Sequence, residues 1–136
     1  MKDNITLLQR AEKDFFTAEL LFANRGEDEL LLDTIAYHIQ QGIEKCLKFR
    51  IQLAGEDYPN THSIKHLINI LDNNDIEVPD WITDNHYILT SYATQTRYST
   101  SVVSTLREIK TFMEEGKKYA ENLNGFRETN ALSDKK

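Results

Sequence analysis

The chain has few residues that cross-link or interrupt a fold: its 136 residues include one cysteine, two prolines and five glycines. The single cysteine, Cys46, excludes an internal disulfide, and its place on the apolar side of a helical pattern indicates a buried thiol in a reducing compartment. No apolar run approaches membrane-spanning length, and the N-terminus leads into amphipathic sequence rather than a secretory signal. We therefore expect a soluble cytoplasmic protein without a membrane segment. One domain of this length can bury its own core without disulfides or metal.

The sequence also lacks an extended basic surface and a complete set of catalytic residues. The formal charge of -6 disfavours broad, sequence-independent binding to nucleic acid. Basic residues do gather locally on two neighbouring predicted helices, at Lys45, Lys48, Arg50, Lys65 and His66. They are open to two interpretations: a small phosphate-sized positive patch, or a solvated helix face with ion pairs such as Glu44 to Lys48.

Apolar residues recur at alternating steps of three and four along most of the chain, which predicts helices rather than strands. The predicted helices span about residues 4–24, 28–54, 63–71, 80–93 and 102–124. Short connections favour an all-α fold, an antiparallel four-helix up-and-down bundle with an additional short helix. We place the helical domain at residues 1–124, with Gly125 ending the last helix, and expect residues 125–136 to form a flexible C-terminal tail.

Several residues predict how individual helices begin, end and pack. Gly26 suits the left-handed residue after the first helix, Asp33 or an earlier acid suits the N-cap of the second helix, and Ser63 suits that of the third. Gly42 lies in the middle of the second helix, where glycine costs about 1 kcal/mol relative to alanine. We therefore expect another helix to approach closely at Gly42.

The second predicted helix carries a polar stripe that needs an explanation. His38, Gln41, Lys45 and Lys48 fall on one side of this helix, while a row of isoleucines falls on the other. One face therefore builds the core, and the polar face is free to meet solvent, a ligand or a partner.

Two further places carry candidate functional residues. His62 and His66 have the spacing of a metal pair, but a third ligand is missing, so a cap-region side chain and a surface residue are the simpler interpretation. Arg97 next to Tyr98 suits bidentate binding of phosphate with a stacking ring beside it. An interhelical salt bridge from Arg97 to an acid such as Asp14 or Glu44 explains the arginine equally well.

Taken in order, these residues resemble a known family. The resemblance rests on the segments Ala11–Asp14, Ala18–Leu21, Tyr37–Lys48 and Thr61–Ile64, followed by Tyr92 and Arg97-Tyr98. They are similar to the pattern of the HEPN domain, in unbroken order from Asn4 to Leu123.

This resemblance implies an all-α bundle that forms homodimers and is often encoded beside, or fused to, a nucleotidyltransferase. Some HEPN proteins resemble metal-independent ribonucleases and toxins of toxin-antitoxin pairs, and others are proposed to bind nucleotides or to support a partner enzyme. The family's positions, carried over residue by residue as ligand-binding candidates, are His38, Gln41, Glu44, Lys45, Lys48, His62, Arg97 and Tyr98.

The sequence departs from the ribonuclease type of HEPN domain. That type has a histidine four to six residues after an arginine, and no arginine here has one; Ser99 also stands where a proline commonly follows Arg-Tyr. The favoured interpretation is a homodimeric module that binds a nucleotide or RNA or serves a nucleotidyltransferase partner, with no catalytic residue, cofactor or metal assigned. The alternatives are a ribonuclease toxin in which His38 or His62 replaces the missing histidine, and a purely structural interaction protein.

Overall fold

The computed structural model describes the backbone of residues 2–93 and 106–134, and the side chains of residues 7–93 and 106–125. It confirms the all-α fold: the described residues form helices and no strand. The helices are α1 (Lys2–Ala23), α2 (Glu29–Leu53), α3 (Ile64–Asn73), α4 (Asp80–Asp84), α5 (His86–Ser91) and α6 (Leu106–Asp134).

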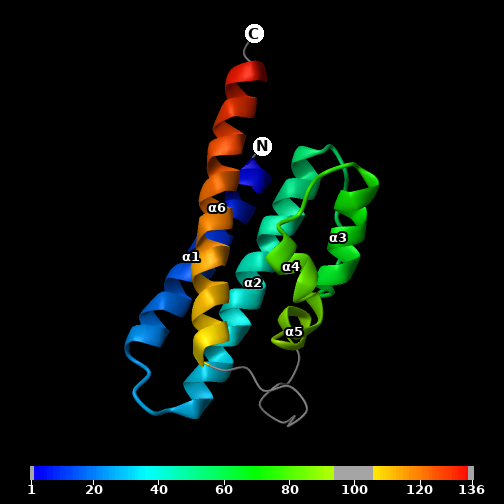
Figure 1. Cartoon of the computed structure of the whole chain (residues 1–136). Helices are drawn as coiled ribbons and strands as arrows, with labels where there is room; N and C mark the ends of the chain where they lie inside the picture. Colours follow the sequence, from blue (N-terminus) through cyan, green and yellow to red (C-terminus); the bar gives the residue numbers. More distant parts are fainter. Residues whose placement is uncertain (1, 94–105, 135–136) are drawn as a thin grey trace.

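Four of these helices pack alongside one another as a bundle. In Figure 1, α1 and α2 run antiparallel as a hairpin, α6 runs alongside both of them, and α3 rises beside α2 in the same direction as α2. The two short helices α4 and α5 follow α3, and Trp81 of α4 stacks on Phe112 of α6 with ring centroids 6.1 Å apart. None of the described helices is long and apolar enough to cross a membrane.

The centre of the bundle is the ring of Phe15, which packs between two glycines. A Cβ placed on Gly42 of α2 would lie 2.6 Å from Cζ of Phe15, and a Cβ on Gly116 of α6 would also overlap the ring. The expected close approach at Gly42 is therefore confirmed. The two glycines let three helices meet around one buried aromatic side chain.

The predicted helix boundaries hold for the first half of the chain. Asp28 is the N-cap of α2 and accepts a hydrogen bond from the backbone N–H of Leu30, and Ser63 caps α3 by accepting from His66 N–H. Gly26 has a φ of +57°, the left-handed conformation expected after α1.

Two predicted boundaries in the second half were wrong. The helix expected over residues 80–93 is divided at Asn85, whose φ of -117° is not helical and whose side-chain amide donates to the carbonyl of Trp81. The last helix does not end at Gly125 but continues to Asp134, since an interior glycine costs only about 1 kcal/mol and no proline follows it. The predicted start near residue 102 lies outside the described residues, and the division into a domain and a flexible tail stays a prediction.

Candidate functional site

The first part of the candidate site is an ionic contact between α1 and α2. Asp14 of α1 faces the polar stripe of α2, where Nδ1 of His38 lies 3.0 Å from one carboxylate oxygen and Nζ of Lys45 lies 2.5 Å from the other. These contacts span more than twenty residues of sequence. Asp14 therefore fastens the two helices of the hairpin together through their polar faces.

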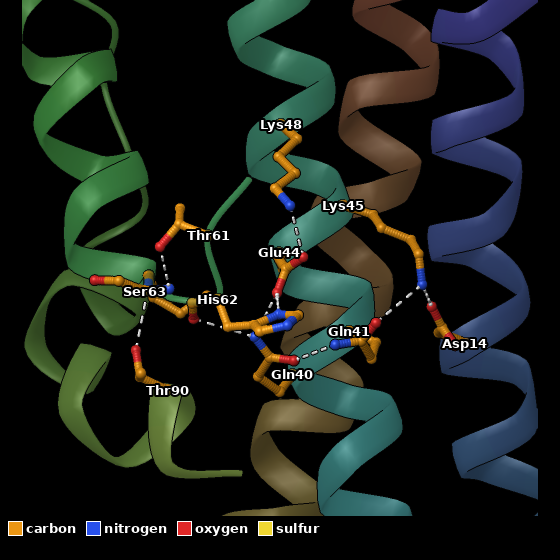
Figure 2. Close-up of polar contacts among 11 residues, drawn as sticks. Asp14, Gln40, Gln41, Glu44, Lys45, Lys48, Thr61, His62, Ser63 and Thr90 are labelled. Carbon is orange, nitrogen blue, oxygen red and sulfur yellow. Dashed lines mark hydrogen bonds and ion pairs between the residues drawn. The ribbon is translucent and has the colours of Figure 1, made fainter. Parts of the chain in front are cut away.

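The second part is built around the carboxylate of Glu44, one turn before Lys48 on α2. Oε2 of Glu44 accepts from Nζ of Lys48 at 2.8 Å, and Oε1 accepts from Nε2 of Gln40 at 2.9 Å and from Nδ1 of His62 at 2.8 Å. Figure 2 shows these side chains converging on Glu44, with His62 reaching it from the segment before α3. Only 6% of the Glu44 side chain is exposed.

Two glutamines join the two carboxylates into one network. Nε2 of Gln41 donates to Oε1 of Gln40 at 2.7 Å, and Nζ of Lys45 donates to Oε1 of Gln41 at 3.5 Å. Gln40 is fully buried and also donates to the backbone carbonyl of His62. A continuous polar network, drawn in part in Figure 2, thus runs from α1 across α2 to the segment before α3.

Glu44 remains ionised despite its burial. Burial alone would raise the pKa of its carboxyl, but hydrogen bonds from Lys48, Gln40 and His62 and the charge of Lys48 outweigh this effect, so the pKa lies below its usual value. The carboxylate is consequently a fixed negative charge and a hydrogen-bond acceptor at neutral pH.

The members of the network differ sharply in exposure. The imidazole of His62 is 63% exposed, whereas the Lys48 side chain is 9% exposed and its ammonium lies 5.3 Å from the centroid of the Tyr58 ring. The predicted ion pair between Glu44 and Lys48 is therefore present, but the expectation that it lies on a solvated helix face was wrong. Lys48 is enclosed because the segment carrying Tyr58 and His62 folds back over this part of α2.

The sequence identified most of the network but missed two members. Gln40 stands among the isoleucines of the apolar face, and nothing in its spacing separates it from the core; its buried amide is satisfied only because Glu44 and Gln41 are within reach. Among possible partners for Asp14, the sequence pattern suggested Arg97, whereas the structure shows Asp14 bound to His38 and Lys45. Arg97 and Tyr98 lie outside the described residues, so their predicted roles stay predictions.

The histidine pair His62 and His66 lies at the start of α3. Within the part of the chain that the structure describes, no group of three or more His, Cys, Asp and Glu residues could hold a metal ion. The first backbone N–H groups of α3 already have acceptors, since Ile64 donates to Thr90 and His66 donates to Ser63.

Comparison with known families agrees with the all-α fold. The model of the HEPN domain matches residues 6–128, nearly the whole chain. The chain belongs to the HEPN domain family. HEPN domains are all-α and comprise nucleotide-binding and ribonuclease-type proteins, and the network around Asp14 and Glu44 lies wholly within the matched region. No curated protein and no solved structure matches the chain.

Proposed function

We propose that this HEPN protein is a homodimeric binding module that holds a nucleotide or the end of an RNA, alone or for a nucleotidyltransferase partner. The observation that carries the proposal is the pairing of an exposed imidazole, His62, with a buried carboxylate, Glu44. A side chain held in one orientation while open to solvent is prepared to meet a ligand.

The energetics of the network support a role beyond folding. Removing a carboxylate and an ammonium from water costs several kcal/mol for each ion, and well-packed apolar residues in their place are often equally stabilising or more so. The Glu44–Lys48 pair is nearly buried, and the Asp14–Lys45 pair is mostly covered. Polar groups that a core does not need are typical of sites that bind or react.

The exposure of each side chain supports an assignment of roles within the proposed site. Lys48 and Glu44 are enclosed and act as supports, whereas His62, His38 and Gln41 retain exposed surface. We assign Arg97 and Tyr98 to the phosphate and to stacking on the base, from their positions in the family pattern.

A titration of a labelled mononucleotide and a short single-stranded RNA, followed by fluorescence anisotropy, tests this proposal. Saturable binding that Arg97→Ala weakens, with only a modest loss of thermal stability, supports it. The exposed Lys65 provides a control, because Lys65→Ala removes a cation from α3 outside the network. Unchanged binding together with a loss of several kcal/mol of stability would assign Arg97 to an ion pair in the fold.

Metal-independent RNA cleavage is the second candidate function, and one observation favours it. An imidazole whose Nδ1 is bound by a carboxylate has the arrangement of a general base, and His62 with Glu44 has this arrangement. The missing histidine after Arg97 counts against this function, since the ribonuclease-type HEPN domains depend on it. The assay for cleavage closes the Discussion.

A further inference from the structure

His62 combines a fixed orientation with an exposed ring. Its Nδ1 lies 2.8 Å from Oε1 of Glu44, and its backbone carbonyl accepts from the buried amide of Gln40. The side chain and the main chain of His62 are thus both tied to α2. The remaining ring nitrogen, Nε2, makes no hydrogen bond to any residue that the structure describes.

The chemistry of Glu44 determines which ring nitrogen carries the proton. An ionised carboxylate only accepts hydrogen bonds, and Glu44 already accepts from the ammonium of Lys48 and the amide of Gln40. Nδ1 of His62 must therefore be the donor in its contact with Glu44. In the neutral ring, this leaves a lone pair on Nε2, which is then a hydrogen-bond acceptor.

An acceptor at this position selects a donor on the ligand. The oxygens of a phosphate group are acceptors themselves, so the neutral ring of His62 does not attract them. The neighbouring cations do not compensate, because Lys45 is paired with Asp14 and Lys48 with Glu44. The donors that a nucleotide offers are its ribose hydroxyls and the amino and imide N–H groups of its base.

We propose that Nε2 of His62 accepts a hydrogen bond from the ribose 2'-hydroxyl, so that the site selects ribonucleotides over deoxyribonucleotides. This inference rests on the proposed function, because it specifies which group of the proposed ligand forms a hydrogen bond with His62. The 2'-hydroxyl is present in every ribonucleotide, and it is the group that distinguishes RNA from DNA. Since His62 is exposed and water competes for Nε2, we expect a preference of about three- to tenfold.

Titrations of AMP and dAMP at a pH where the ring is neutral, repeated with UMP and dUMP, test this preference. The wild type should bind both ribonucleotides more tightly than their deoxy forms. His62→Asn keeps an N–H donor for Glu44 but has no acceptor at the place of Nε2, so it should bind the two sugars equally. His66→Asn, at the exposed histidine four residues away, should keep the preference.

The tautomer of His62 gives a second readout that needs no ligand. Nitrogen-15 correlation spectra of the neutral imidazole should show the proton on Nδ1 in the wild type, and Glu44→Gln should shift the population toward the other tautomer. A proton on Nε2 in the wild type would overturn the inference directly.

The remaining outcomes separate this inference from the proposed function. Equal affinity for ribose and deoxyribose, or a preference that follows the base instead of the sugar, would overturn the role of His62 and leave nucleotide binding standing. No binding of any of the four nucleotides would overturn both.

Discussion

Glu44 and Lys48 form an ion pair of 2.8 Å in which both side chains are less than one-tenth exposed. Glu44→Gln should leave the Lys48 ammonium enclosed without its counter-charge, and we expect a loss of about 3–5 kcal/mol in the free energy of unfolding. The double variant Glu44→Gln with Lys48→Met should recover much of that loss, since it removes both charges. Urea denaturation of the three proteins measures the difference.

An exposed ion pair provides the matched control. Lys117 of α6 lies 3.2 Å from Glu19 of α1, and both side chains are more than a third exposed. Glu19→Gln should change the free energy of unfolding by less than about 1 kcal/mol. Equal losses at Glu19 and Glu44 would contradict the argument that burial gives the Glu44 pair its importance.

The lowered pKa of Glu44 predicts loss of stability in acid. The carboxyl binds a proton more readily in the unfolded chain, where its pKa is near 4.5, than in the folded protein. Its contribution is therefore complete above the unfolded value and is lost as the pH falls through the lower folded value. Thermal melting between neutral pH and about pH 3 should show a steeper decline for the wild type than for Glu44→Gln. If the melting temperatures of the wild type and Glu44→Gln fell equally as the pH was lowered, the result would contradict the lowered pKa of Glu44.

The packing of Phe15 predicts that substitution by alanine lowers the free energy of unfolding at Gly42 and Gly116 but not at Gly125. Gly42→Ala would place a methyl group against the Phe15 ring, and we expect destabilisation of about 1–3 kcal/mol. Gly116→Ala should behave in the same way. Gly125→Ala meets nothing within 4 Å and should leave stability unchanged or raise it by up to about 1 kcal/mol.

A smaller side chain at position 15 tests whether that ring is the cause. Phe15→Leu should reduce the additional cost of Gly42→Ala in a double-mutant cycle. Strictly additive effects would mean that Gly42 is constrained by something other than Phe15.

The sequence predicted the helical fold well because its signals are local. Ser63 and Gly26 act within a few residues of their own positions, and the structure places both as expected. The N-cap of α2 is Asp28, an earlier acid than Asp33, as the prediction allowed. Asn85 shows the limit: a side-chain amide that bonds to the preceding turn divides a helix that the apolar pattern alone predicts as continuous.

The site was harder to predict because its contacts join residues far apart in the sequence. The spacing of His38, Lys45 and Lys48 showed that they share a face, but the acids that bind them and the burial of Lys48 depend on how α1 and the segment before α3 pack on α2. A glutamine inside an isoleucine-rich face, such as Gln40, gives no sign of its partners until the helix is placed.

We expect the protein to be a homodimer in solution, as the family resemblance implies. Light scattering after size exclusion should give about twice the chain mass of 15.8 kDa. A mass near that of one chain that persists at high micromolar concentration would contradict this prediction.

The central claim is that this HEPN protein binds RNA without cleaving it, and one experiment tests it directly. End-labelled single-stranded and structured RNA are titrated with the protein in chelator, and the same samples are then run on a denaturing gel. The account predicts saturable binding of RNA that stays intact, weakened about three- to tenfold by His62→Asn and not by His66→Asn. Cleavage by the wild type that disappears in Arg97→Ala and in His38→Ala or His62→Ala would contradict it and identify a catalytic pair.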